Sequence, residues 1–501
     1  MELTQLDKQE ATKFGTNVLK LISGKIFIQA IALMVMPIVT RMYTPGDFGI
    51  LKLFTSLTAV IIALSSLRYD FAIMLPKKNE EAINIVALSV LIVGIISSLT
   101  MIFVIMFKNN ISIALGTPEL NFYLWFAPIV IFSGGLLQVF QFWSSRLQQF
   151  GRVAFSGVAS NISSSAVKLT VGAVGKAGPG GLIGAQIVLS TVGVLILAGK
   201  SIFREWSLYK DNITFDTIKH WAKRYKRFPI YSTWSGLFNY GANSLPALLL
   251  AYYYSPVVVG FYGLGYKAIS APMAILTGSV ARVFYQKAAE EKHESGISHL
   301  VEATYRRIVA ICLFPIIILM LHGQSLFGFI FGPQWFEAGL YMQFFAPWLF
   351  FQAISNPMRN IFNVEEKQLE SMSIFFVVFV IKLLVLIAGG IYGYPRFTII
   401  LLGLTCTVIY AFITFRAMSI AGVDVSKSIK ILLQYLAYCI PLLAITIIFK
   451  LYYPRALFFV LIALGCFAYY CYHIFKRDPV LGAIVIEVTK SFLKKSGFKK
   501  V

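Results

Sequence analysis

The sequence is poor in charge, and above all in negative charge. Only 13% of its 501 residues are charged, and its 22 acidic residues are half as many as its 44 basic ones. A soluble chain of this length needs far more polar surface to cover itself. Apolar stretches of about 18–25 residues recur instead, each long enough to cross a bilayer. The composition therefore predicts an all-α polytopic membrane protein.

The sequence also lacks the patterns that chemistry on a substrate requires. The five cysteines lie inside apolar segments without paired spacing, so neither a structural disulfide nor a zinc site is expected. The five histidines show no metal-ligand spacing, and no Ser/His/Asp arrangement suggests a nucleophile. We expect no metal, no cofactor and no enzymatic activity.

Fourteen membrane spans are predicted from the apolar stretches. They lie near 18–40, 49–68, 83–107, 121–143, 155–175, 181–199, 229–252, 259–281, 307–331, 339–358, 372–393, 397–416, 431–449 and 457–475. An even number of spans places both termini on one side of the membrane.

The distribution of basic residues orients these spans. With the N-terminus inside, the inner segments hold 32 of the 44 Lys and Arg residues, and the outer segments hold six. Such a bias places both termini in the cytoplasm. It also accounts for the net charge of +22 without nucleic acid as a partner.

A short motif occurs twice and indicates an internal repeat. Tyr43-Thr44-Pro45-x-x-x-Gly49 recurs as Tyr254-Ser255-Pro256-x-x-x-Gly260, each time between the first and second span of a half. The hydroxyl can cap the next helix, proline fixes φ, and glycine admits close backbone approach. Two copies suggest a duplicated bundle. The predicted organisation is a six-helix lobe (1–210), a second lobe (211–430), two further spans (431–476) and a basic cytoplasmic tail (477–501).

The link between the two lobes is strongly basic and amphipathic. Phe215, Ile218, Trp221, Ala222 and Tyr225 fall at helical spacing, opposite a set of basic side chains. One reading is a helix that lies on the inner leaflet against anionic lipid. The other is a solvated linker that merely satisfies the orientation rule.

Six lysines fall within the predicted spans, whereas no Asp or Glu lies well inside one. A lysine at membrane depth normally faces a partner or a water-filled cavity. Without carboxylates to pair, the natural partner is an anionic substrate. Snorkelling towards headgroups accounts for Lys20, and it is an alternative for Lys52. The candidate substrate-binding residues are Lys25, Lys52, Lys168, Lys267 and Lys382, with Gln29 on the face of Lys25.

Two of these lysines have distinct sequence surroundings. Lys168 ends a stripe formed by Ser156, Ser160 and Ser164, which faces either a polar cavity or a neighbouring helix through small-residue packing. Lys382 has no polar neighbours in its span.

Two prolines occupy nearly matching positions in the first span of each half. Pro37 and Pro246 precede the tyrosine of the repeated motif by six and eight residues. Because proline breaks the backbone hydrogen-bond ladder, both are candidate hinges; a static kink is the alternative.

Two segments resemble a known family. The stretch Arg41 to Gly49, and Ser66-Leu67-Arg68-Tyr69-Asp70-Phe71 continuing through Pro76 and Lys77 to Glu80-Glu81-Ala82, are similar to those of bacterial polysaccharide flippases of the Wzx type. These belong to the multidrug/oligosaccharidyl-lipid/polysaccharide (MOP) exporter superfamily. The resemblance covers essentially the whole chain.

The resemblance implies a V-shaped, MATE-like bundle of two six-helix lobes around a central cationic cavity. Its implied substrate is an undecaprenyl-pyrophosphate-linked oligosaccharide, flipped across the bacterial inner membrane for O-antigen or capsule synthesis, beside other polysaccharide-assembly membrane proteins. Relatives build their cavity largely from spans one, two, seven and eight, and Lys25, Lys52 and Lys267 lie on three of these. The two extra spans resemble lipid-groove helices. The alternatives are a multidrug or cation exporter of the same fold, a membrane glycosyltransferase or polymerase acting on the same lipid-linked sugar, and a scaffold for envelope enzymes.

Overall fold

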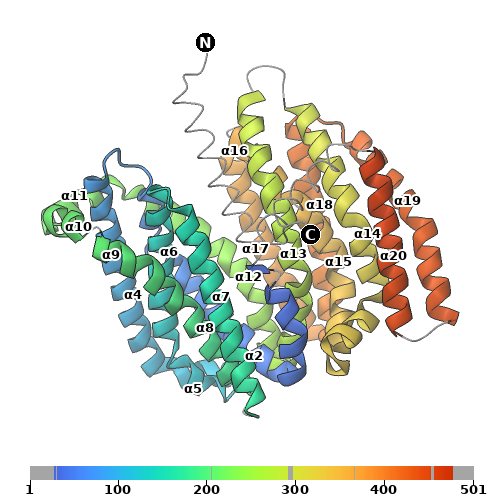
Figure 1. Ribbon diagram of the computed structural model, residues 1–501, viewed down its shortest axis with the longest axis horizontal. Coiled ribbons are helices and arrows are strands. Elements are labelled where there is room, and N and C mark those ends of the chain that lie inside the picture. Colours follow the sequence, from blue (N-terminus) through green and yellow to red (C-terminus); the bar gives the residue numbers. More distant parts are fainter. Residues whose placement is uncertain are drawn as a thin grey trace, which may run out of the picture. The chain divides into compact units, whose positions relative to one another are not determined.

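The computed structural model describes residues 28–29, 31–175, 177–204, 206–291, 297–365, 367–452 and 456–477. Within these ranges the chain is helical, with short turns and no strand (Figure 1). The helices divide between two compact units. Unit 1 takes the described residues up to Leu264 together with Phe375–Pro395, and unit 2 takes the remainder.

Unit 1 contains the helices of the first half and part of the link. After a helix over Ile31–Met42, its elements are α2 (Pro45–Leu64), α3 (Tyr69–Ala72), α4 (Asn79–Ala114), α5 (Leu120–Leu124), α6 (Ala127–Arg146), α7 (Phe150–Ala173), α8 (Pro179–Val194), the π-helical turn η1 (Leu195–Gly199), α9 (Lys200–Arg204), α10 (Trp206–Asn212), α11 (Phe215–Arg224), the π-helical turn η2 (Phe228–Ser232) and α12 (Thr233–Tyr253). The helix α13 (Pro256–Glu291) begins in unit 1.

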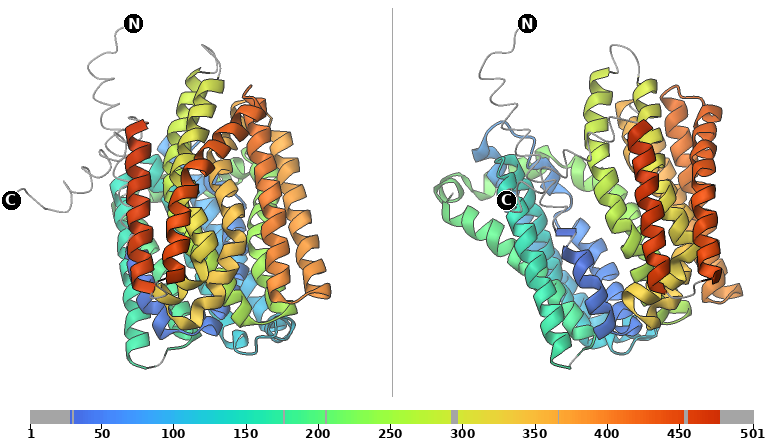
Figure 2. Two further views of the ribbon diagram at one scale, coloured as in Figure 1. Left: turned by 90° about the vertical axis from the view of Figure 1, so that its right-hand side faces the viewer. Right: turned by 45° about the vertical axis from the view of Figure 1, so that its right-hand side comes forward.

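Unit 2 is organised around a long helix, α14 (Ser298–Phe331), which packs against α15, α19 and α20. Its further elements are η3 (Pro333–Trp335), α15 (Phe336–Met358), α16 (Asn360–Val364), α18 (Pro395–Ile420), α19 (Val425–Tyr452) and α20 (Ala456–Arg477). The helix α17 (Gln368–Tyr392) starts in unit 2 and continues in unit 1. Figure 2 shows the orange-to-red helices α18, α19 and α20 of unit 2 from two further sides.

Eight helices in the described part of the chain are long and apolar enough to cross a membrane. They are Pro45–Leu64, Asn79–Ala114, Ala127–Arg146, Pro179–Phe203, Ser298–Phe331, Leu369–Tyr392, Pro395–Ile420 and Val425–Ile448. The expectation of an all-helical, multi-pass membrane protein is confirmed. Several helices run past the predicted span ends, as α4 and α14 do, because hydropathy registers only the apolar stretch of a helix.

One predicted boundary is wrong in a consequential way. The span expected over 49–68 ends as a helix at Leu64, and a turn follows over residues 65–68. Leu67 and Arg68 have φ angles of 47° and 63° in this turn. A right-handed helix cannot continue through such residues.

The repeated motif forms the helix starts that its residues predict. The Thr44 hydroxyl accepts a hydrogen bond from the Asp47 backbone N–H at 3.2 Å, and Asp47 accepts from the Thr44 N–H at 2.8 Å. This capping box begins α2 with Pro45 in its first turn. In the second copy the Ser255 hydroxyl accepts from the Val258 N–H at 3.4 Å. The predicted capping role is therefore confirmed in both copies.

The glycines of the two motif copies pack against each other's backbones. A Cβ added at Gly49 would overlap the carbonyl oxygen of Pro256, and one added at Gly260 would overlap that of Pro45. The predicted close backbone approach is confirmed, and the partner of each copy is the other copy. One helical turn further on, the side-chain stem of Lys52 lies against Gly263.

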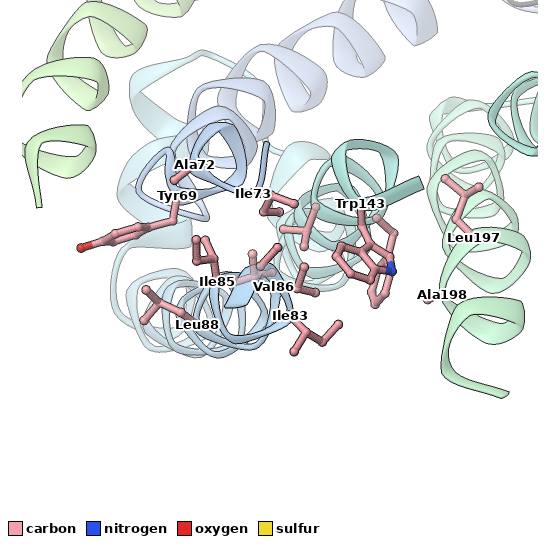
Figure 3. Packing of buried hydrophobic residues seen from close by; sticks show 14 residues of the cluster. Tyr69, Ala72, Ile73, Ile83, Ile85, Val86, Leu88, Trp143, Leu197 and Ala198 are labelled. Carbon is pink, nitrogen blue, oxygen red and sulfur yellow. The ribbon is translucent and has the colours of Figure 1, made fainter. Parts of the chain in front are cut away.

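A cluster of buried side chains fills the end of unit 1 where α3, α4, α6 and η1 meet (Figure 3). Trp143 is fully buried at its centre and donates a hydrogen bond to the Ser201 hydroxyl at 3.0 Å. Tyr69 lies at the edge of the cluster, and Figure 3 shows its hydroxyl directed away from it. Residues of the turn after α2 and of α3 pack against this cluster, so it supports the turn.

Candidate functional site

The turn after α2 contains two of the three non-glycine residues with a positive φ angle in the described chain. Two consecutive residues, Leu67 and Arg68, have left-handed backbone conformations, which are costly for residues with a Cβ. Such conformations persist only where surrounding contacts enforce them, and they gather at functional sites. We call residues 65–78 the Arg68 loop.

A buried carboxylate holds the start of the Arg68 loop. Asp70 is fully buried and accepts hydrogen bonds from the Ser66 hydroxyl at 2.8 Å and the Gln138 amide at 2.7 Å. Burial raises the pKa of the Asp70 carboxyl, while the Ser66 bond, the nearby Arg68 charge and the Gln138 bond act in the opposite direction. Asp70 thus ties the loop to α6.

Arg146, at the end of α6, holds the rest of the Arg68 loop. Its guanidinium donates to the carbonyl oxygens of Ile73 at 3.0 Å, Pro76 at 2.8 Å and Lys78 at 3.1 Å. An arginine fork suits several acceptors at once because its donors are fixed in one plane. The loop conformation is therefore determined by many contacts.

These contacts present the Arg68 side chain to α12. Its guanidinium carbon lies 5.2 Å from the ring centre of Phe71 and 5.4 Å from that of Tyr240, both within cation–π range. Gly236 makes the space for it, since a Cβ there would collide with the Arg68 Nη2 atom. The side chain is only 7% exposed.

The Arg68 guanidinium has no hydrogen-bond acceptor or ion-pair partner within the described part of the chain. The Asp70 carboxyl interacts with the Arg68 charge through space, but its oxygens accept their hydrogen bonds from Ser66 and Gln138. The Arg68 donors are not used within the described chain, so they are open to an acceptor from outside it. Arginine matches phosphate oxygens with two parallel hydrogen bonds. The arrangement can therefore bind a phosphate-type group.

A polar face of α12 continues from this cation. Asn239 and Asn243 are exposed and one helical turn apart. At 100° per residue they share one side of the helix with Gly236 and Tyr240. The helix coincides with the span predicted over 229–252, and exposed amides in a span require water or polar ligands rather than lipid tails. Amide groups beside a cation and an aromatic ring can bind hydroxyl-rich ligands.

The predicted lysines are distributed over both units. Lys52 is half-buried in α2, with its stem against Gly263 in unit 1. Lys267 is exposed on α13 and belongs to unit 2. Lys25 lies outside the described residues, and Gln29, four positions on, is half-buried. Their role in substrate binding stays a prediction.

The serine stripe before Lys168 faces a helix. Ser156, Ser160 and Ser164 are 2–4% exposed. The Ser156 hydroxyl donates to the carbonyl of Gly193 in α8 at 3.2 Å. Small-residue packing therefore accounts for the stripe, and Lys168 at its end is half-buried.

Lys382 and the two candidate hinge prolines are buried or half-buried. Lys382 in α17 is 1% exposed, so it is closed off from solvent in this conformation. Pro246 lies inside α12 and is buried. Pro37 is half-buried, and the Thr40 hydroxyl donates to its carbonyl at 3.1 Å. Hinge motion at either proline stays a prediction.

Sequence reasoning missed Arg68, Tyr240, Asn239 and Asn243. In the sequence, Arg68 is one of the basic residues of the predicted inner segments that orient the spans. Its neighbour Asp70 was the available signal, because an Arg-x-Asp pair is unusual in a chain so poor in acid. The α12 asparagines form an i, i+4 pair within a predicted span, a pattern that marks a polar face.

Comparisons with known proteins add a family and a fold. Residues 38–340 match the family described as "Polysaccharide biosynthesis protein". No protein in the curated collection matches. The chain is similar to a solved structure described as "Lipid II flippase MurJ, inward closed conformation", with 13% identity, a TM-score of 0.68, and coverage of 92% of this chain and 99% of that chain.

Two MATE transporter structures are similar at a lower level. A MATE family transporter of the MOP superfamily in an inward-facing conformation has 14% identity, a TM-score of 0.49, and coverage of 81% of this chain and 95% of that one. A MATE transporter from Vibrio cholerae has 14% identity, a TM-score of 0.48, and coverage of 82% and 97%. The likeness to the flippase structure establishes the fold.

Proposed function

Because the chain belongs to the polysaccharide biosynthesis protein family, we propose that it is a flippase for an undecaprenyl-pyrophosphate-linked oligosaccharide. It moves this lipid from the inner to the outer leaflet of a bacterial cytoplasmic membrane, for O-antigen or capsule assembly. The architecture proposed for it is fourteen spans, arranged as lobes over 1–210 and 211–430 and two further spans over 431–476, with both termini in the cytoplasm.

The observation that supports this proposal most directly is Arg68. A nearly buried guanidinium without an acceptor in the described chain suits the pyrophosphate, and the Asn239 and Asn243 amides suit sugar hydroxyls. Tyr240 and Phe71 hold the cation in place. Lys25, Lys52 and Lys267 are proposed to add charge along the path, with Lys168 and Lys382 in supporting positions.

The proposed mechanism is alternating access with Pro37 and Pro246 as hinges. The anionic head is held by basic side chains while the prenyl chain stays in lipid. A membrane potential that is negative inside favours the outward movement of an anion by about 2.3 kcal/mol per charge per 100 mV. The field therefore favours outward movement of the pyrophosphate, and direction needs no ATP site.

The test is a deletion in the native host, complemented with the wild-type chain, Arg68→Gln, Lys25→Ala, Lys267→Ala, or Lys77→Ala as control. Lys77 is an exposed lysine of the same loop. The measurement is the lipid-linked oligosaccharide that accumulates on the inner leaflet, beside surface polysaccharide. We expect accumulation with the deletion and with Arg68→Gln, and clearance with Lys77→Ala.

Two results would contradict the proposal. If the intermediate crosses normally in the deletion strain and then remains unpolymerised, the protein acts after translocation, as a polymerase or transferase does. If flipping is lost on deletion but Arg68→Gln complements fully at normal expression, the function stands and the Arg68 site is wrong.

A further inference from the structure

One face of helix α11 packs against the rest of unit 1. The Thr217 hydroxyl donates to the side-chain oxygen of Asn84 in α4 at 2.6 Å, and the Tyr69 hydroxyl donates to the Ala222 carbonyl at 3.0 Å. Ile218 and Trp221 pack against the buried cluster of unit 1. Figure 1 shows α10 and α11 beside the end of α4. The apolar stripe predicted from the sequence is thus largely covered by protein.

The face of α11 next to this one is basic, and it carries the exposed ring of Phe215 from the edge of the predicted stripe. Phe215, Lys219 and Lys223 follow at i, i+4 and i+8, which places them on one side of the helix. Phe215 is 79% exposed, and both lysines are exposed. Lys226 and Arg227, just beyond the helix, are also exposed. An apolar tip among cations is the pattern of a membrane-surface helix.

The depth of α11 can be estimated along α4. Its contact residue Asn84 precedes Leu91, which is 53% exposed and begins the run of exposed apolar side chains on α4. Seven residues of helix correspond to about 10 Å. The preceding span ends at Phe203, which is 89% exposed and only a short link before Phe215. This level is that of lipid headgroups, just outside the hydrocarbon core.

We propose that α11 is a docking helix for anionic phospholipid headgroups. Phe215 enters the lipid, and Lys219, Lys223 and Lys226 bind headgroup phosphates. The inner leaflet is the side that the charge bias predicts for this end of the chain. An acidic protein partner fits less well, because it would leave Phe215 at headgroup level without a lipid contact.

Lipid docking at α11 is mechanically linked to the Arg68 loop. The bond from Tyr69 to Ala222 joins the loop to the helix directly. Headgroups that hold α11 in place therefore restrain the loop from which Arg68 projects. The significance of this restraint for transport rests on the proposed function, whereas the docking itself does not.

The first experiment measures lipid contact without any transport substrate. A fluorescent probe is placed at Phe215→Cys in a Cys471→Ser background, since the other four cysteines are buried. The full chain is held in nanodiscs of phosphatidylcholine and phosphatidylglycerol, with bromine quenchers on one lipid or the other. We expect brominated phosphatidylglycerol to quench the probe at least twice as strongly as the same fraction of brominated phosphatidylcholine.

Matched charge variants locate this preference. The triple Lys219→Gln, Lys223→Gln, Lys226→Gln should abolish it, and the corresponding Lys→Arg triple should keep it. The control triple Lys77→Gln, Lys367→Gln, Lys430→Gln removes the same charge from other exposed lysines and should also keep it. Equal quenching by the two lipids, equal loss in both Gln triples, or no quenching by either lipid would overturn the proposal; the last result is that expected for a protein partner.

A second measurement tests the link to the loop. Hydrogen–deuterium exchange over residues 65–78 should slow when phosphatidylglycerol is added to the wild-type chain. Tyr69→Phe removes the hydroxyl that bonds to Ala222 and should abolish the slowing while the lipid preference of the probe remains. If the exchange rate over these residues in the wild-type chain does not change when phosphatidylglycerol is added, the coupling is wrong. Neither measurement requires flipping, so failure here is distinguishable from failure of the proposed function.

Discussion

At the scale of single residues, the most informative feature is Arg68, a cation held in place without a hydrogen bond or ion pair to any residue that the structure describes. Arg68 is held by strained backbone, two aromatic rings and a glycine-sized gap. Moving a cation out of water lowers the free energy of unfolding unless nearby negative charge compensates it, and Asp70 supplies part of that compensation. The anionic substrate proposed above would supply acceptors for the guanidinium.

The first prediction concerns the guanidinium. Arg68→Lys keeps the charge but loses the planar fork and the ring stacking. A charged hydrogen bond contributes about 1.5–3 kcal/mol, so affinity for a pyrophosphate-linked substrate should fall roughly tenfold to a hundredfold. Binding to the purified protein measures this. The thermal midpoint should be unchanged or raised, and a large fall in it would show that Arg68 is structural.

The second prediction displaces Arg68 without changing it. In Gly236→Ala the new Cβ collides with Nη2, so the guanidinium must move. Substrate binding should fall as it does in Arg68→Lys. Gly184→Ala is the control, because no atom lies within 4 Å of a Cβ at that helical position. A binding loss shared by both variants would point to a general effect of alanine in these helices.

The third prediction follows from the raised pKa of Asp70. Its folded pKa lies above the unfolded value, so its contribution to stability is full below the unfolded pKa and is lost as the pH rises through the folded pKa. Asp70→Asn removes this dependence. Relative to wild type, the thermal midpoint of the variant should therefore rise as the pH increases above the ordinary aspartate pKa of about 4. Asp211→Asn, at an exposed carboxylate, should show no such trend.

At the scale of elements, the contact between the two motif copies determines how closely α2 and α13 approach. The fourth prediction is that Gly49→Ala and Gly260→Ala each destabilise unit 1 by about 1–3 kcal/mol, since the added Cβ overlaps a backbone carbonyl. Thermal unfolding measures the effect. Gly46→Ala is the control in the same motif, because its Cβ would lie at ordinary distances of 3.6 Å and 3.8 Å from its neighbours.

The double variant sharpens this prediction. One shift of the helices relieves both overlaps, so Gly49→Ala with Gly260→Ala should cost less than the sum of the two single changes. Strict additivity would mean that the two glycines act at independent places.

The sequence predicted elements better than the site, for physical reasons. The length of an apolar stretch identifies a membrane helix. A Ser or Thr just before a helix identifies an N-cap, since its hydroxyl accepts from a backbone N–H two or three residues later. Both signals are local in the sequence. The partners of Arg68 are not local: Gly236 and Tyr240 lie far along the chain. The serine stripe before Lys168 is a second example, because its spacing fits a stripe that faces either a cavity or a neighbouring helix. The hydrogen bond from Ser156 to the distant Gly193 shows that it faces a helix.

At the scale of the whole molecule, the asymmetry of basic residues predicts the orientation. The fifth prediction is that cysteines at Lys77 and Lys367 react with a membrane-impermeant maleimide only from the cytoplasmic side. Cysteines at Glu119 and Tyr394 should react only from outside; all four positions are exposed. Labelling of intact and permeabilised cells measures this. Reaction of Lys77→Cys in intact cells would reverse the orientation.

The reciprocal glycine contact also bears on the ancestry of the chain. Each motif copy supplies both a glycine and the carbonyl that the other copy's glycine admits. That is the form of an isologous interface, in which one surface patch meets its own duplicate. A half-length ancestor could have dimerised through this patch before its gene was duplicated and fused. After fusion, a larger residue at either glycine would require the backbone of the other motif copy to move. The two motifs are therefore expected to diverge together or not at all.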